Sequence, residues 1–203
     1  FDAREGCDHP RSPNGCGNVW SSPAVDVERQ RLYIVSSNCD SDDDPQTPEP
    51  TPVMPPFDEA IFALDFDGNA AWRWRPREVD NLDLAFGAVP NLFTIQTEHG
   101  AIDVLGVGGK DGTYYVLDRD GVNEISGVAW NDADPSQLPY WRRNVVAGGA
   151  FGGVLATASI DEERRRVYFG TAPGDTMAEV LNPQLPSVHA LDLDTGEIVW
   201  DNG

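Results

Sequence analysis

Short runs of β-branched, aromatic and aliphatic residues recur along the chain, and turns rich in glycine, aspartate and proline separate them. One stretch organises the rest: residues 104–107 and 113–117 are apolar, and the sequence Gly-Gly-Lys-Asp-Gly lies between them. Glycine and aspartate readily adopt the positive φ angles that tight hairpins need. We therefore predict two antiparallel strands with Lys110 at the tip of the hairpin, closed by a second turn at residues 118–121.

The same pattern predicts the other strands. They lie at residues 19–25, 31–35, 60–64, 86–93, 127–130, 151–159, 166–170, 188–191 and 197–200, and a further strand carries Trp72 and Trp74. No segment has a sustained helical period, so an all-β fold is expected. The turn-forming residues at 1–17 predict an irregular segment before the first strand. The proline- and aspartate-rich residues 40–56 predict an exposed loop.

A longer repeat groups these strands in fours. A Leu-Asp pair followed by a glycine and then a tryptophan occurs three times, at Leu64-Asp65 with Gly68 and Trp72, at Leu117-Asp118 with Gly121 and Trp130, and at Leu191-Asp192 with Gly196 and Trp200. Four short strands per repeat, with a tryptophan on the last, are typical of a β-propeller blade. We predict blades at residues 18–84, 85–148 and 149–203, with each tryptophan packed between neighbouring blades.

Three blades do not make a closed ring, because propellers usually have about four to eight. The two end blades would leave apolar faces open. The chain also begins at Phe1, without an initiator methionine or a signal peptide. We therefore expect it to be part of a larger propeller, completed by the remaining blades or by another subunit.

The sequence is strongly acidic, with a formal net charge of -20 over 203 residues. Phosphate binding needs basic surfaces, so neither a nucleic acid nor an anionic membrane surface is an expected partner. No apolar run reaches the roughly 20 residues that cross a bilayer, so no membrane span is predicted. The three cysteines, Cys7, Cys16 and Cys39, lack the spacing of a zinc site. They favour an oxidising compartment with one disulfide of unassigned pairing, and three free thiols remain the alternative.

The sequence Ala-Leu-Asp-x-x-Thr-Gly-Glu-x-x-Trp at residues 190–200 resembles the repeat of the pyrroloquinoline quinone (PQQ) enzymes. Residues 19–26, 86–93 and 110–119 look like further segments of that family, in the family's order. The resemblance is to the eight-bladed quinoprotein alcohol dehydrogenases, and in particular to their polyvinyl alcohol dehydrogenase-like branch. It implies PQQ and calcium as cofactors, a cytochrome or other carrier as electron acceptor, and a periplasmic or extracellular location.

The resemblance also implies a role for three residues of a cofactor pocket. Trp20 matches the tryptophan that stacks on the quinone, Asn38 matches an asparagine that ligates calcium, and Lys110 matches the basic residue at the quinone's reactive oxygens. The residues themselves leave other interpretations open. Trp20 could pack between blades and Asn38 could belong to an ordinary turn. Lys110, the only lysine of the chain, could be a solvated surface charge.

The sequence departs from the family at the expected catalytic base. An ungapped match places Ala85 where the family has an aspartate that ligates calcium and takes the alcohol's proton. Asp83 lies two residues earlier, on the same face of an extended strand, and is the predicted substitute as base and metal ligand, with Asp80 as a further candidate. Two hypotheses remain: a PQQ-dependent alcohol dehydrogenase that uses Asp83, or a non-catalytic propeller that acts as a binding or assembly scaffold.

Overall fold

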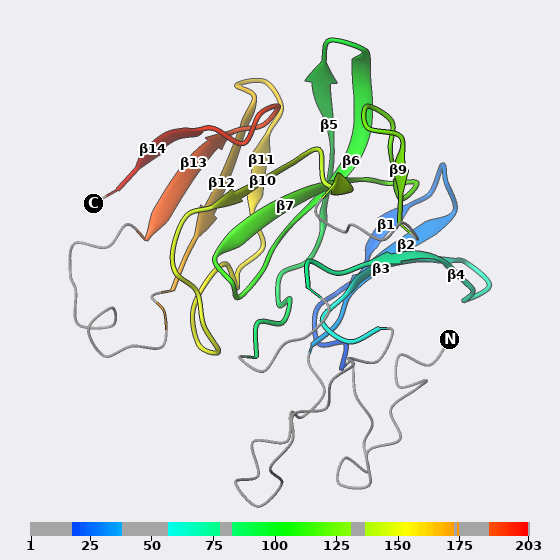
Figure 1. The fold of residues 1–203 in the computed structure, drawn as a ribbon, viewed down its shortest axis with the longest axis horizontal. Helices are drawn as coiled ribbons and strands as arrows, with labels where there is room; N and C mark the ends of the chain where they lie inside the picture. Colours follow the sequence, from blue (N-terminus) through cyan, green and yellow to red (C-terminus); the bar gives the residue numbers. More distant parts are fainter. Residues whose placement is uncertain are drawn as a thin grey trace, which may run out of the picture.

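The computed structural model describes residues 18–37, 57–77, 83–130, 137–172, 174 and 187–202. These residues form three four-stranded antiparallel sheets and one two-stranded sheet, and they contain no α-helix. Figure 1 shows the three larger sheets side by side, with the second sheet between the first and the third. The all-β prediction is confirmed. Among the described residues there is accordingly no helix that could cross a membrane.

Each larger sheet follows the chain from one edge to the other, as in a propeller blade. The first sheet contains β1 (Ala24–Asp26), β2 (Arg31–Val35), β3 (Ile61–Asp65) and β4 (Ala70–Trp74). The second contains β5 (Asn91–Thr97), β6 (Gly100–Gly108), β7 (Thr113–Asp118) and β10 (Trp141–Asn144). The third contains β11 (Ser159–Asp161), β12 (Arg166–Gly170), β13 (Val188–Asp192) and β14 (Ile198–Asp201). The small sheet pairs β8 (Val122–Asn123) with β9 (Val128–Ala129).

The hairpin predicted around Lys110 is confirmed as β6 and β7, which pair antiparallel with Gly106 opposite Val116. Three other strands begin several residues later than predicted, and β11 is displaced the most, since it begins at Ser159, the last residue of the strand predicted at residues 151–159. β1 begins at Ala24 and β5 at Asn91, and each of these residues directly follows a proline, Pro23 or Pro90. A proline has no N–H to donate to a sheet, which accounts for both starting points.

The predicted fourth strand of the second sheet is wrong. Residues Val128 and Ala129 pair with β8 in a separate hairpin, and β10 pairs with β7 in their place. Trp130 is consequently 38% exposed, whereas Trp141, on β10, is 9% exposed. The extra hairpin between β7 and β10 displaces the blade-ending tryptophan by eleven positions along the chain, from 130 to 141.

The first and second sheets meet through Trp72 of β4. Its indole Nε1 donates a hydrogen bond to the carbonyl oxygen of Arg119, 2.8 Å away. Its ring lies against Gly121, where an added Cβ would come within 2.5 Å of the ring. Gly121 has a φ of 73°, a conformation that glycine adopts without strain. The predicted packing of a tryptophan between neighbouring blades is confirmed here.

The second and third sheets meet in the same way through Trp141. Its Nε1 donates to the carbonyl oxygen of Leu193 at 3.2 Å, and its ring lies against Gly196, which has a φ of 69°. Arg119 and Leu193 each follow the aspartate that ends the third strand of their sheet. The two junctions therefore use equivalent positions of successive sheets.

The hydrophobic core lies between the sheets. One cluster joins side chains of β2, β3 and β4 to side chains of β6 and β7, among them Tyr33, Trp74, Leu105 and Tyr115. A second cluster joins the second sheet to the third and includes Phe93, Tyr114, Val167 and Leu191. Neighbouring sheets thus bury apolar side chains against each other, and a smaller third cluster around Phe62 lies within the first sheet and its flanking residues.

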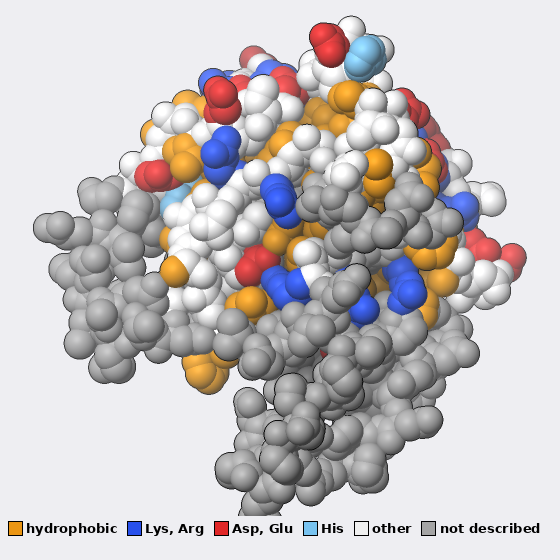
Figure 2. Space-filling view, viewed as in Figure 1, with side chains coloured by type: hydrophobic (Ala, Val, Ile, Leu, Met, Phe, Trp, Pro, Cys, Tyr) orange, Lys and Arg blue, Asp and Glu red, His pale blue; other side chains and the backbone are white. Residues whose placement is uncertain are grey.

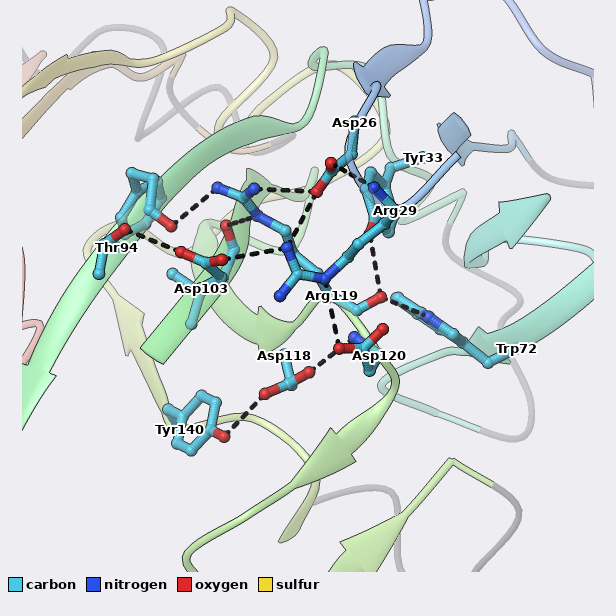
Figure 3. A network of polar contacts seen from close by, with 12 residues as sticks. Asp26, Arg29, Tyr33, Trp72, Thr94, Asp103, Asp118, Arg119, Asp120 and Tyr140 are labelled. Carbon is cyan, nitrogen blue, oxygen red and sulfur yellow. Dashed lines mark hydrogen bonds and ion pairs between the residues drawn. The ribbon is translucent and has the colours of Figure 1, made fainter. Parts of the chain in front are cut away.

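A polar network around Arg119 adds to the first junction, as Figure 3 shows. The Arg119 guanidinium donates to Asp26 at 2.9 Å and to the carbonyl oxygens of Val104 and Phe93, both at 3.1 Å. Arg29 extends the network, because it contacts both Asp26 and Asp103. Figure 2 shows both basic and acidic side chains on the face that it draws. The guanidinium groups tie β1 to the second sheet.

Replacing Trp141 by phenylalanine tests the second junction. The variant keeps an aromatic ring but loses the buried hydrogen bond to Leu193 and part of the contact with Gly196. We expect Trp141→Phe to lower the free energy of unfolding by about 1–3 kcal/mol, measured by urea denaturation. Trp130→Phe is the matched control, with an expected change within about 0.5 kcal/mol. Equal losses in the two variants would contradict the assignment of Trp141 as the junction residue.

The network around Asp26 predicts a pH dependence of stability. Burial alone would raise the pKa of Asp26, but hydrogen bonds from Arg29 and Arg119 and their charges lower it overall. The unfolded chain therefore binds a proton before the folded one as the pH falls. The stabilisation is complete above the unfolded pKa of about 3.9 and is lost as the pH falls through the lower folded pKa. We expect the cost of Asp26→Asn in urea unfolding to shrink as the pH falls below about 4. The cost of the uncharged Trp130→Phe substitution should stay constant over the same range.

Candidate functional site

Lys110 lies in the turn between β6 and β7, and only 6% of the residue is exposed. Its amide donates to the carbonyl oxygen of Ala85 at 3.1 Å, and its own carbonyl oxygen accepts from the amide of Gly149 at 2.9 Å. Two loops thus cover the turn, one before β5 and one after β10. The side chain is not the solvated surface charge that a turn lysine commonly is.

The Lys110 ammonium has two partners from other segments. Its Nζ lies 2.8 Å from Oδ1 of Asp83 and 5.7 Å from the ring centre of Trp20. The second distance is within the range of a cation–π contact. The structure therefore brings together Trp20, Asp83 and Lys110, three of the four residues predicted for the site. The fourth, Asn38, and the further candidate Asp80 lie outside the described residues.

Trp20 is held by its edge and exposes much of its surface. Its Nε1 donates to the carbonyl oxygen of Phe86 at 3.1 Å, and Gly87 lies beside the ring. Trp20 is 63% exposed, whereas Trp72, at the blade junction, is 3% exposed. An anchored but exposed indole next to a buried cation can receive the face of a flat ligand. Trp20 does not pack between two blades in the manner of Trp72.

Asp83 does not belong to an extended strand, so the premise on which it was predicted is wrong. Its φ is 54°, in the left-handed region, which costs a non-glycine residue on the order of 1–2 kcal/mol. Its carboxylate reaches Lys110 all the same. Ala85 is fully buried and contributes its backbone carbonyl to the Lys110 turn. The left-handed turn, instead of strand alternation, directs the carboxylate of Asp83 to the ammonium.

Sequence reasoning missed two residues beside this site. The carboxylate of Asp111 lies 2.6 Å from Nη2 of Arg77, and the same guanidinium lies 3.6 Å from the buried Glu59. Asp111 could have been noticed because it follows Lys110 in the chain. Arg77 gives no local signal, since 34 residues separate it from Asp111.

Residues 2–143 match the family model described as "PQQ: Glucose/ethanol/alcohol dehydrogenase, beta-propeller domain". The chain belongs to this family. It is 26% identical over 203 residues to a polyvinylalcohol dehydrogenase of Pseudomonas sp., covering 91% of this chain and 26% of the relative. It is 25% identical over 212 residues to a polyvinylalcohol dehydrogenase of Sphingopyxis sp. (strain 113P3), covering 93% of this chain and 27% of that relative. The chain thus spans about a quarter of the length of these relatives.

Solved structures of two alcohol-oxidising dehydrogenases share the fold. A europium-containing methanol dehydrogenase matches with a TM-score of 0.65 and 14% identity, over 92% of this chain and 39% of that protein. The quinohemoprotein alcohol dehydrogenase of Comamonas testosteroni matches with a TM-score of 0.55 and 18% identity, over 93% of this chain and 35% of that protein. The resemblance to the PQQ propeller family and the assignment to part of a β-propeller are therefore confirmed.

The described residues of this PQQ-family chain fit a flat, anionic quinone better than a metal ion. The Trp20 face and the Lys110 charge suit the ring and the oxygens of PQQ. For calcium, which takes about six to eight oxygen ligands, the described part offers the carboxylates of Asp83 and Asp111 beside Lys110, and these are already paired with Lys110 and Arg77. No group of three or more His, Cys, Asp or Glu residues in that part is arranged to hold a metal.

The site also predicts the effect of a substitution at Gly153. A Cβ there would lie 2.2 Å from the Lys110 carbonyl oxygen, and its φ is 81°. Gly127 has a similar φ of 72° but no atom within 4 Å of an added Cβ, which makes it a matched control. We expect Gly127→Ala to cost about 1–2 kcal/mol of unfolding free energy and Gly153→Ala a further 1–3 kcal/mol or so. Urea unfolding measures both, and equal costs would show that the residue 153 segment does not hold the turn.

Proposed function

We propose that this chain is part of a quinoprotein dehydrogenase that oxidises an alcohol by hydride transfer to PQQ. The observation that carries the proposal is the buried Lys110 ammonium, which contacts both the Asp83 carboxylate and the face of the exposed Trp20. A cation, a carboxylate and an aromatic face are the groups that such a reaction needs side by side. When bound, PQQ supplies an electrophilic quinone that accepts a hydride from the alcohol carbon.

Trp20 binds the cofactor in this proposal. Its ring is anchored at one edge by the Phe86 carbonyl, so little conformational entropy is lost when a planar ligand stacks on it. Lys110 orients the same ligand through its quinone oxygens. An ammonium has three donors, so Lys110 can keep its contact with Asp83 while it donates to a ligand oxygen. Its charge stabilises the negative charge that develops on that oxygen as the hydride arrives.

Asp83 is the proposed general base. Its carboxylate takes the proton of the alcohol hydroxyl as the hydride leaves the carbon, which gives a carbonyl product. The contact with Lys110 supports this role, because Lys110 is the residue proposed to orient the cofactor's reactive oxygens. Asn38 and Asp83 remain predicted calcium ligands. The described residues do not supply the ligand set that calcium needs.

The relatives suggest the wider setting. Two of them are named polyvinylalcohol dehydrogenases, so a polymeric secondary alcohol is the proposed substrate class. One structural neighbour is a quinohemoprotein, which supports a haem protein as the electron acceptor. We propose a periplasmic or extracellular location and completion of the ring by further blades of the same kind. Trp200, which occupies the junction position on β14, is 46% exposed and suits such a neighbour.

A second candidate function is a non-catalytic propeller that acts as a scaffold. The observation that favours it is the fully buried Ala85 at the position where the family has its catalytic aspartate. An alanine side chain can neither bind a metal nor accept a proton. The two functions differ in whether Asp83 has taken over that role.

Reconstitution of the complete protein with PQQ and calcium distinguishes the two functions. We expect a cofactor absorbance band and alcohol-dependent reduction of a dye. Asp83→Asn should lower kcat by about 10²–10⁴-fold, the usual contribution of a general base, while the absorbance band remains. Asp67→Asn, an exposed turn carboxylate, is the control and should keep full activity. A protein that binds no PQQ would support the scaffold, and an Asp83→Asn variant with full activity would remove Asp83 from the mechanism.

A further inference from the structure

Asp111 follows Lys110 in the turn but has different partners. One of its oxygens, Oδ2, lies 2.6 Å from Nη2 of Arg77 and accepts a hydrogen bond from the Tyr115 hydroxyl. The other, Oδ1, accepts from the amide of Thr113 at 3.1 Å. These contacts fix the carboxylate at the base of the turn, where it accepts from its own hairpin and from Arg77, which follows the first sheet.

Arg77 contacts both chain segments that form the Lys110–Asp83 pair. It follows β4, and its Nη2 contacts Asp111, the neighbour of Lys110. Its Nη1 donates to the carbonyl oxygen of Leu84, the neighbour of Asp83, at 3.5 Å. A guanidinium is a rigid planar fork, so two contacts from one group fix a geometry as well as a distance. One arginine thus spans the two segments.

The two segments also pair through their backbones, in an isolated antiparallel bridge between Phe86 and Gly109 and in the hydrogen bond from the Lys110 amide to the Ala85 carbonyl. The Arg77 contact at Leu84 adds a side-chain attachment one residue nearer to Asp83. Asp83, in its left-handed conformation, needs such support, because a strained residue keeps its conformation only where its surroundings hold it. The two attachments together constrain the loop from which the carboxylate extends.

The electrostatics keep this arrangement charged. Burial alone would lower the pKa of Arg77, but Asp111, Tyr115 and Glu59 act in the opposite direction and the net shift is upward. The side chains of Arg77 and Asp111 are 19% and 16% exposed, so the ion pair is shielded more than a surface pair. Loss of either partner leaves the other poorly compensated.

We propose that Arg77 and Asp111 are positioning residues, which hold the Lys110 ammonium at its contacts with Asp83 and Trp20. Neither residue touches the proposed ligand, and both act through the turn and through the loop at residues 83–85. The kinetic consequence of this proposal rests on the proposed function. The geometric consequence does not, because it concerns the position of Lys110 in the protein without PQQ.

Lys110 can be observed directly by NMR. With isotope-labelled lysine, its ε-methylene signal in the complete protein is assigned as the one that disappears in Lys110→Arg. The Trp20 ring current shifts this signal upfield, and Trp20→Leu gives its position without the ring. We expect Arg77→Met and Asp111→Asn to move the signal toward that position, because the turn is no longer held.

Arg165→Met is the matched control. Arg165 is a similarly shielded arginine, with a 26% exposed side chain that pairs with Asp194 in the third sheet. It should lose a comparable ion pair and leave the Lys110 signal in place. In the PQQ-loaded complete protein, Arg77→Met should lower kcat by up to about a hundredfold, as misplacement of about 1 Å can do, whereas Arg165→Met should not.

The outcomes separate the two proposals. An unmoved Lys110 signal in folded Arg77→Met and Asp111→Asn overturns the positioning role, and so does unfolding of both variants, which would make the pair a stability element. Asp111→Asn keeps the volume of the side chain and carries the test where Arg77→Met alone unfolds. A moved signal in a protein that never oxidises an alcohol upholds the positioning role and counts against the proposed function.

Discussion

The contact between an indole ring and a glycine of the next sheet is the interaction on which the rest of this structure depends. Trp72 and Trp141 each combine a buried N–H donation with close packing on a glycine of positive φ. The hydrogen bond fixes the orientation of the indole, and the absence of a Cβ on the glycine lets the ring approach the next sheet closely. The two larger core clusters lie between neighbouring sheets, so these two contacts fix how those cores close.

The candidate site is a product of that arrangement. Trp20 precedes the first sheet, Asp83 lies between the first and second, and Lys110 is in the turn of the second. They meet only when the first two sheets are docked and the loop after β10 covers the turn. The glycines of that loop, Gly148 and Gly153, approach the Lys110 backbone so closely that any side chain would interfere. Burial of the lysine is therefore a tertiary effect, although its position in a hairpin is a local one.

Much of the fold could be predicted from the sequence because its signals are local. The β6–β7 hairpin followed from glycine and aspartate between apolar runs, and the Trp72 junction followed from the repeat. Trp130 misled because it is the first tryptophan after Gly121, although it follows that glycine by nine residues, whereas Trp72 and Trp200 follow theirs by four. Strand pairing with β7 decides between Trp130 and Trp141, and that pairing depends on where the inserted hairpin ends.

The sequence brought three of the predicted site residues together, but it did not give their geometry. Family resemblance selected Trp20 and Lys110, and strand alternation selected Asp83 as a substitute for the aspartate missing at position 85. The three residues lie together, but the assumed strand at Asp83 is a left-handed turn. Arg77 could not be predicted from the sequence, because its contacts with Leu84 and Asp111 join separate segments of the chain.

The two tryptophan junctions also have a polarity. In both, the fourth strand of one sheet supplies the ring, and the turn after the third strand of the next sheet supplies the carbonyl and the glycine. Successive sheets therefore dock in one rotational direction, because each junction takes its tryptophan from one sheet and its carbonyl and glycine from the next. A sheet with both parts could be inserted, duplicated or exchanged without redesign of its neighbours. Such interchangeable joints let a propeller change its number of blades while the residues between two particular blades specialise for a ligand.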